Sequence, residues 1–373
     1  MMMLDPQRIL AGAVVAGLDP SARMHSAPRW KLGLPHCRAA LRGLEAIGAR
    51  HHPLLSVLRD MTDGADAPSY YDKLLSALSA CEGDDESSRH IDRLSRAVTE
   101  NVRLLYFSAD AHEFAFAGGA EAPLNAPGPG LVPPGDTGRI SIIIPFRSRE
   151  NTGLRVRNLR ACLAALRRQS LDRAQYSVTL VESDYGSHHS QHFASEVDNY
   201  LHHRDSGPFN KSAAVNHGVA EAAGDAILCL LDADMILPPT FLERMQSQVT
   251  AGSPLLPYED ALCLDFNSSA RLASAVEEGN GTLRGTYSGY LLRRPPGGCV
   301  MISSEDFQAI GGFDTRFSGW GGEDRDFINR LEAIAPVRRE PGILLHLLHE
   351  RPDMRDDHDG IMRTALRGGG PTS

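Results

Sequence analysis

Three apolar runs separated by two helical patterns constrain the fold of this chain more than any other feature. The runs are "RISIIIPF" at 139–146, "YSVTLVESD" at 176–184 and "DAILCLLDADMILPP" at 225–239. Each is rich in aliphatic residues without polar alternation, as is typical of strands buried on both faces. The segments between them, around 154–169 and 210–224, are helical in pattern. This alternation predicts an α/β sandwich with a mainly parallel sheet between helices.

The sequence before residue 117 has a different pattern. Its apolar residues recur at helical spacing in "SYYDKLLSALSAC" at 69–81 and in "SSRHIDRLSRAVTENVRLLYF" at 87–107. We therefore predict a helical N-terminal module over 1–116 and, from its Gly and Pro content, a linker over 117–138. The α/β domain would occupy 139–355, and 356–373 would be a disordered tail. From its size and patterned faces, we expect the module to recognise an acceptor or to form a homo-oligomer.

Charge and cysteine usage exclude several classes of function. A formal net charge of -9 argues against nucleic acid as the main partner, because phosphate binding needs a basic face. No apolar run approaches the roughly 18 residues of a membrane helix, and we interpret Ile9–Leu18 as the end of a short helix. The six cysteines are scattered, without a C-x-x-C pair. Reduced thiols and a cytoplasmic location are the expectation.

Polar residues follow the predicted strands, at the sheet edge where ligands bind in parallel α/β folds. They are Arg147, Arg149, Glu182, Asp184, Asp232 and Asp234. Asp232 and Asp234 are two residues apart, so both would project to one side of an extended strand end. Two carboxylates on one side favour a divalent cation that carries phosphate oxygens. An ordinary turn is the alternative for this pair.

The other polar residues also have two interpretations each. Arg147 and Arg149 could bind phosphate through their guanidinium forks, or could simply be solvated. Glu182 could accept a hydrogen bond from a base or ribose, or could cap the next turn. His346 and His349 follow a strand-like "GILLHLL" and suit ligation of Mn²⁺ or a similar metal, although single histidines are more often structural.

The stretch "FSGWGGEDRDFINRL" at 317–331 places Trp320, two glycines and two acids before a helical pattern. Acids in the first turn of a helix complement its dipole, which is the structural explanation. The chemical explanation is that the glycines let a substrate approach the backbone, Trp320 offers it a flat face, and a carboxylate accepts a proton. The helix dipole would lower the pKa of Asp324 and its acidic neighbours would raise it. The sign of the net shift stays open.

Taken in order, these motifs resemble the catalytic domain of the β-1,4-galactosyltransferases and related family 2-like glycosyltransferases of the GT-A fold. "IIIPFRSRE" is similar to the family's opening strand and "LLDADM" to its D-x-D strand. In "FNKSAAVNHG", Lys211 stands where the family has a donor-binding Arg. The longest similar block runs from 297 to 331. In "HLLH", His349 stands at the family's His ligand and His346 at its Met ligand.

The resemblance implies a GT-A domain, Rossmann-like with a mainly parallel sheet between helices. It further implies an inverting transfer from a UDP-sugar to a hydroxyl on a glycan, small molecule or peptide, with Mn²⁺ or another divalent cation. Asp324 would be the general base and Glu323 would hold the acceptor hydroxyl. The remaining implied roles are donor binding by Pro145, Phe146, Arg147, Arg149, Glu182, Lys211, Asp232 and Gly298, sugar or acceptor binding by Trp320, Gly321 and Gly322, and metal binding by Asp234, His349 and His346.

Two other functions remain open at this point. One is a catalytically silent protein that binds nucleotide sugars or serves as a scaffold. The other is a sugar-phosphate nucleotidyltransferase, but "PFRSRENTG" lacks the Gly-rich loop expected there. "RRPP" at 293–296 stands where the galactosyltransferases have an aromatic residue, so the donor sugar is not specified.

Overall fold

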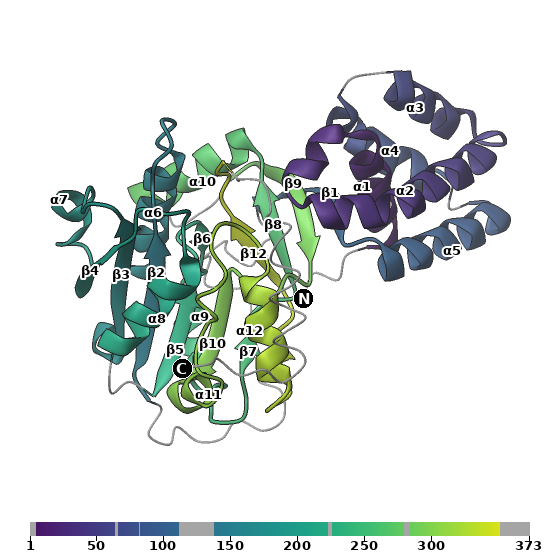
Figure 1. Ribbon diagram of the computed structural model, residues 1–373. Coiled ribbons are helices and arrows are strands. Elements are labelled where there is room, and N and C mark those ends of the chain that lie inside the picture. Colours follow the sequence, from purple (N-terminus) through teal and green to yellow (C-terminus); the bar gives the residue numbers. More distant parts are fainter. Residues whose placement is uncertain are drawn as a thin grey trace. The chain divides into compact units, whose positions relative to one another are not determined.

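The computed structural model describes residues 5–63, 66–81, 83–111, 138–222, 226–279 and 284–350 (Figure 1). These residues fall into two compact units. One comprises Met1–Phe114, Asp260–Ser269 and Arg284–Arg294, and the other comprises Ala115–Glu259, Ala270–Leu283 and Pro295–Ser373. Apart from Gly138, the predicted linker lies outside the described residues, as does the predicted tail at 356–373.

The second unit is built on a seven-stranded sheet in the order β11-β7-β10-β5-β2-β3-β4 (Figure 1). β5, β2, β3 and β4 run parallel to one another, and β11 runs parallel to β7, whereas β10 is antiparallel to both β5 and β7. The strands are β2 (Ile140–Phe146), β3 (Tyr176–Asp184), β4 (Asn199–Arg204), β5 (Ile227–Leu231), β7 (Leu255–Leu256), β10 (Cys299–Ser303) and β11 (Arg338–Arg339). The predicted α/β class with a mainly parallel sheet is confirmed.

Continuous apolar runs form the centre of this sheet, since every residue of β2, β3 and β5 is buried. The helices of the unit are α6 (Leu154–Leu166), α7 (Ser190–Phe193), α8 (Lys211–Glu221), α9 (Phe241–Gln246), α11 (Ser304–Ala309) and α12 (Glu323–Glu332). α10 (Phe266–Glu278) contains residues of both units. One core cluster joins sheet and helices through Ile143, Val181, Val215, Leu230, Phe327 and Leu331.

α8 lies unusually close to the sheet at Gly218. A Cβ at this position would overlap the side chains of Ile143 on β2 and Val181 on β3. Asn210 caps the helix by accepting a hydrogen bond from Ala213 N at 2.8 Å. The close approach and the cap together fix the first residue of α8, Lys211, relative to the ends of β2 and β5.

The third predicted strand is interrupted at the D-x-D motif. β5 ends at Leu231, β6 is the short strand Met235–Ile236, and Met235 N donates to Asp232 O at 3.2 Å to form a turn. The expectation that Asp232 and Asp234 project to one side of an extended strand is therefore wrong. The turn directs the two carboxylates to different partners, Lys211 for the first and two histidines for the second.

The first unit contains five α-helices among its described residues and three strands that pair antiparallel. The helices are α1 (Pro6–Leu18), α2 (Ala27–Gly48), α3 (His52–Asp63), α4 (Tyr71–Ser79) and α5 (Asp85–Asn101), with short 3₁₀ turns at Pro20–Met24 and Ala67–Tyr70. The strands are β1 (Leu104–Asp110), β8 (Asp260–Leu264) and β9 (Thr286–Arg293). No helix in the described ranges is long and apolar enough to cross a membrane.

The prediction that the helical pattern continues to residue 107 is wrong. α5 ends at Asn101, and Leu104–Asp110 is a strand that pairs along its whole length with β9. A strand partner from the C-terminal half overrides the local helical spacing, as tertiary pairing commonly does. This unit is therefore neither purely helical nor confined to the residues before 117.

Candidate functional site

The first group of the site is formed where β6 pairs with β12 (Ile343–His346). The antiparallel register sets His346 opposite Met235, and Leu347 N donates to Asp234 O at 2.8 Å. This pairing brings together Asp234 and the two histidines that lie more than a hundred positions later in the sequence. Three residues that the sequence predicted as metal ligands therefore meet in space.

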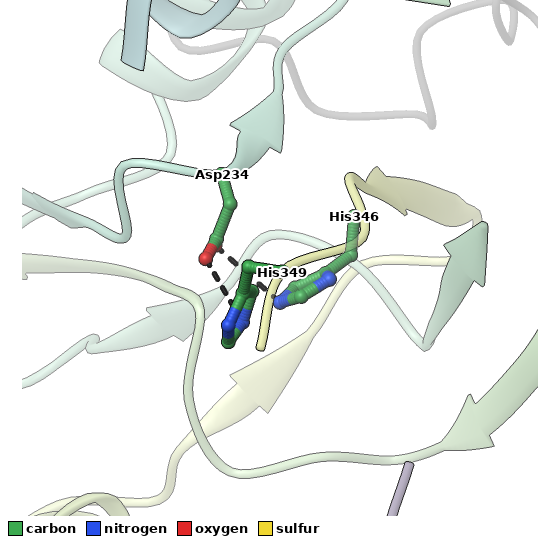
Figure 2. A group of neighbouring side chains, drawn as sticks. All are labelled: Asp234, His346 and His349. Atoms are coloured by element: carbon green, nitrogen blue, oxygen red, sulfur yellow. Dashed lines mark ion pairs between the residues drawn. The ribbon is translucent and has the colours of Figure 1, made fainter. Parts of the chain in front are cut away.

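Figure 2 shows the three side chains directed toward one another. His346 Nε2 lies 3.4 Å from Asp234 Oδ1, and His349 Nε2 lies 3.1 Å from Asp234 Oδ2. One donor atom from each residue lies within 4.8 Å of the other two. Divalent ions bind oxygen and nitrogen at about 2.0–2.2 Å, which puts neighbouring donor atoms roughly 3 Å apart. The donor set and its spacing therefore fit a divalent cation such as Mn²⁺.

His349 is held in the orientation that a metal ligand needs. Its Nδ1 lies 2.7 Å from Glu350 O, and because a carbonyl only accepts, Nδ1 carries the proton. Nε2, which faces Asp234, then keeps its lone pair in the neutral ring. Buried Asn158 on α6 donates to Leu348 O at 3.0 Å and so anchors the segment beside His349. The sequence analysis missed Asn158, whose only signal is a polar residue within an apolar helical pattern.

A second group is centred on the ammonium of Lys211. Its Nζ lies 2.7 Å from Asp232 Oδ1 and 3.0 Å from Asp324 Oδ1, so it bridges the D-x-D turn and α12. Burial alone would lower the pKa of Lys211, but the carboxylates around it raise that pKa well above its usual value. Burial raises the pKa of Asp232 to about 6, against the opposing effect of Lys211. The lysine predicted to bind a donor thus contacts the proposed base directly.

Glu323 and Asp324 open α12, whose N-cap is Gly322. Glu323 is only 8% exposed, and among the described residues its Oε2 has no hydrogen-bond partner. Burial raises the pKa of Glu323 to about 7, and the neighbouring Asp324 carboxylate adds to the shift. A buried carboxyl oxygen without a partner in the protein is available to a ligand.

The raised pKa of Glu323 predicts a pH-dependent stability. Folding favours the protonated acid, so its contribution is complete below the unfolded-state pKa of about 4.3 and is lost as pH rises toward about 7. Across that window, the unfolding free energy of the wild type should fall relative to that of Glu323→Gln by on the order of 1–3 kcal/mol. Urea unfolding of both proteins across this range measures the difference. Parallel pH profiles would contradict the prediction.

The segment Gly297–Gly298 lies between the D-x-D turn, which carries Asp232, and the start of α12, which carries Asp324. Gly298 O accepts from Asp232 N at 2.9 Å, and buried Tyr258 donates its hydroxyl hydrogen to Gly297 O. A Cβ at 297 would overlap the carboxylate of Asp324. The close approach of this backbone to Asp324 therefore requires glycine. Neither Gly297 nor Tyr258 was predicted as a site residue, and Tyr258 lies in no motif.

Replacing Gly297 with Ala should displace the Asp324 carboxylate, because Tyr258 and Asp232 restrain the backbone that would otherwise move away. We expect kcat of any transfer reaction to fall on the order of 10²-fold, with a destabilisation of about 1–3 kcal/mol from overpacking. Gly83→Ala is the matched control, because a Cβ there meets nothing within 4 Å. Equal kcat values for the two variants would show that Asp324 does not need this space.

Residues predicted for donor and base share one small cavity. It is lined by Pro145, Lys211, Val215, Leu230, Leu231, Asp232, Gly298, Val300, Phe313 and Asp324. The loop before α12 is attached to the segment before α8, since Gly319 N donates to Phe209 O at 2.9 Å. Trp320, Gly321 and Gly322 are half-buried in that loop, and positive φ angles at both glycines make its sharp course possible.

The strand-end arginines and Glu182 are engaged with the protein's own loops. Buried Arg147 donates to Ser183 O, to Gly207 O and to both the backbone and the side chain of Asp205. Arg149 forms an ion pair with buried Asp184.

Glu182 accepts from His188 N at 2.9 Å and from the hydroxyl of Tyr200, which is the turn-capping alternative. Phe146 packs against the rings of His189 and Phe193. Donor binding by Arg147, Arg149, Glu182 and Phe146 stays a prediction. In the structure, their side chains contact neighbouring loops of the protein itself.

The cysteines are consistent with the reduced state expected from sequence. All six lie in the described ranges, are buried and form no disulfide bond. Cys229 on β5 and Cys299 on β10 face each other with their sulfur atoms 3.9 Å apart, too far for a disulfide bond. They pack as small apolar side chains behind the D-x-D turn.

Two family models match this sequence. "Glycosyl transferase family 2" matches residues 141–256, which include β2, β3, β5 and the D-x-D turn. "N-terminal domain of galactosyltransferase" matches residues 289–341, which include the Gly297–Gly298 segment and the start of α12. Lys211 and Asp232 fall in the first match, and Glu323 and Asp324 in the second.

Individual proteins are similar over shorter or more distant stretches. Human chondroitin sulfate synthase 3 is 24% identical over 152 residues, which are 38% of this chain and 16% of that protein, and the mouse protein is 25% identical over 153 residues. The catalytic domain of Drosophila β1,4-galactosyltransferase 7, in complex with xylobiose, has 14% identity and a TM-score of 0.37 over 60% of this chain and 79% of that chain. A mannosyltransferase of Pyrobaculum calidifontis, with GDP-Man and Mn²⁺, has 15% identity and a TM-score of 0.36 over 61% of each chain.

The two family matches lie in the order and in the segment that the motifs predicted. The seven-stranded α/β unit contains the whole of the first match and, from Pro295 onward, the second. The resemblance to glycosyltransferases drawn from the sequence is thereby confirmed over residues 141–256 and 289–341, which match a glycosyl transferase and a galactosyltransferase family model.

Proposed function

We propose that this chain is a metal-dependent, inverting glycosyltransferase that moves a sugar from a UDP-sugar to a hydroxyl acceptor, with Asp324 as the general base. The observation that carries the proposal is the bridge of Lys211 between Asp232 and Asp324, at 2.7 and 3.0 Å. It joins the D-x-D turn, which leads into the candidate metal ligands, to the acids that would meet an acceptor. Donor and acceptor chemistry would thus occur at one cavity.

Asp234, His346 and His349 would hold the divalent cation. When bound, it would supply positive charge for the diphosphate that leaves. Lys211 would supply a second positive charge from the protein itself, since its raised pKa keeps it protonated at neutral pH. Cationic groups on both sides of a diphosphate stabilise the charge that develops as its bond to the sugar breaks.

Transfer requires a base because an alcohol is a weak nucleophile. The acceptor oxygen would attack the anomeric carbon while the bond from that carbon to the diphosphate oxygen breaks, and the hydroxyl proton would pass to Asp324. Before the donor arrives, Lys211 pairs with Asp324 at 3.0 Å. A bound diphosphate would compete for the same ammonium and so free the carboxylate to accept the proton. Glu323 would orient the acceptor through its unpartnered carboxyl oxygen.

The chain spans only 16% of the length of its curated relatives, so their complete activity is not transferred to it. Their name, chondroitin sulfate synthase, denotes a protein that makes a glycan. Among glycan, small molecule and peptide, that name supports a glycan hydroxyl as the acceptor. The donor sugar is left to experiment.

The test is release of UDP from a panel of UDP-sugars by the full chain, with Mn²⁺ and with a chelator in its place. We expect release from at least one donor, with loss of release in the chelator and recovery when Mn²⁺ is added. Equal release without metal would contradict metal dependence. Release from nucleoside diphosphate sugars of another base, but from no UDP-sugar, would contradict the donor class.

One observation favours a second function, that of a silent nucleotide-sugar-binding protein. The ion pair of Lys211 with Asp324 occupies the proposed base, and a permanent pair would prevent proton transfer. Titration of UDP into the protein separates the two functions. Tight binding of UDP without release from any donor, in the presence of Mn²⁺, would favour the silent protein.

A further inference from the structure

Charge is strongly segregated along the first unit. Residues 20–50 contain six Lys or Arg and one acid, whereas residues 51–111 contain six Lys or Arg and eleven acids. The basic stretch corresponds to the turn at Pro20–Met24 and to α2. A basic helix in a chain of net charge -9 requires an explanation.

The basic residues of α2 lie on one solvent-facing strip. Lys31, Arg38 and Arg42 are all exposed. At 3.6 residues per turn, they fall within about 40° of one another around the helix axis and span about 16 Å along it. The opposite side of the helix is buried through Cys37, Ala40, Leu44 and Ile47, and α2 packs there against α1, α3 and α5 (Figure 1).

Most of these basic side chains have no acidic partner among the residues that the structure describes. Arg23, Lys31, Arg38 and Arg42 form no ion pair with any residue in the described ranges. Arg50, just beyond α2, instead pairs with Glu86 at 2.8 Å. The strip contains one acid, Glu45, at its C-terminal end. The strip is therefore a positively charged surface exposed to solvent.

Two large exposed apolar residues belong to the same stretch of sequence as the cations, Met24 directly after Arg23 and Leu32 directly after Lys31. Leu32 is 75% exposed and Met24 is 66% exposed, the two highest values among the exposed large hydrophobic residues. Pro28 and Ala39 on the same side of α2 are also exposed. Basic side chains by themselves would bind any polyanion. Large apolar side chains next to them favour a partner that offers both negative charge and an apolar layer.

We propose that this basic strip of α2, with Leu32 and Met24, docks the protein on an anionic lipid surface. Lysine and arginine attract anionic headgroups within about a Debye length, and the two apolar side chains would enter the headgroup region. The acidic remainder of the chain is repelled by such a surface, so binding would occur through this strip. Binding to lipid is separate from the proposed glycosyl transfer, and it can be tested without measuring catalysis.

The experiment is co-sedimentation of the full chain with vesicles of phosphatidylcholine, with and without phosphatidylglycerol, in about 0.1 M salt. We expect binding to the anionic vesicles only, and its loss when salt is raised. Arg38→Glu combined with Arg42→Glu should lower the partition coefficient at least about tenfold. Arg93→Glu combined with Arg96→Glu is the matched control, because it makes the same charge change at exposed positions of α5. This control should bind several-fold more tightly than the α2 variant.

Leu32→Ser separates a lipid surface from a soluble polyanion. It should weaken vesicle binding several-fold while leaving retention on heparin unchanged. Equal loss of vesicle binding by both double variants would overturn the assignment to α2. Absence of vesicle binding by the wild type, with retention on heparin, would identify an acidic polysaccharide as the partner and overturn the proposal. Circular dichroism of each variant verifies the fold.

Discussion

Asp324→Asn is expected to lower kcat by about 10²–10⁴-fold while leaving the KM for the donor nearly unchanged. The amide has almost the shape of the carboxylate, and its oxygen can still accept a hydrogen bond from Lys211, which lies 3.0 Å from Oδ1 in the wild type. It cannot take the proton of an acceptor hydroxyl. Steady-state kinetics of transfer, with donor and acceptor varied separately, give the two constants.

Glu332→Gln is the matched control for that substitution, because Glu332 is an exposed acid at the other end of α12. We expect it to retain the wild-type kcat. An Asp324→Asn protein that transfers sugar as fast as the Glu332→Gln protein would remove Asp324 from the role of base. The donor-binding part of the account would then stand without it.

His349→Ala should raise the dissociation constant for Mn²⁺ by at least about 10–100-fold. The substitution removes one of three donor groups, and the Nε2 that it removes lies 3.1 Å from Asp234 Oδ2. Loss of metal affinity should appear as loss of activity that excess Mn²⁺ partly restores. Calorimetric titration of Mn²⁺ into the wild type and the variant measures the affinity directly.

His192→Ala is the control for this prediction, since His192 is an exposed histidine on α7 that belongs to no predicted site. Its Mn²⁺ affinity should equal that of the wild type. If His349→Ala also bound Mn²⁺ as tightly as the wild type, the group in Figure 2 would not be the metal site.

The α/β unit was predictable because its central strands are encoded locally. Tyr176–Asp184 was predicted with the bounds that the structure has, since burial on both faces leaves an uninterrupted apolar run. β1 was not predictable in this way. Leu104 and the residues after it continue the helical spacing of α5, and only pairing with β9, far away in the sequence, makes them a strand.

The sequence predicted which residues belong to the site, but not which of them contact one another. The motifs placed Asp234, His346 and His349 as ligands, yet only the register of β6 and β12 shows that they meet. The turn between Asp232 and Asp234 separates two acids that spacing alone put on one side.

Three other contacts of the site could not be predicted from the sequence. Lys211 matched a donor-binding motif, and its second contact with Asp324 depends on how α8 and α12 are placed. Tyr258 and Gly297 act through single backbone and steric contacts, which have no sequence pattern.

The most direct test of the account is a crystal structure of the full chain grown with Mn²⁺ and UDP, with anomalous data collected at the manganese edge. We predict one strong anomalous peak bonded to Asp234 and to His349, on the same cavity as Asp324 and with a UDP phosphate attached. A manganese peak bound elsewhere, or UDP bound with Asp324 on a different surface, would contradict the claim that these residues form one site.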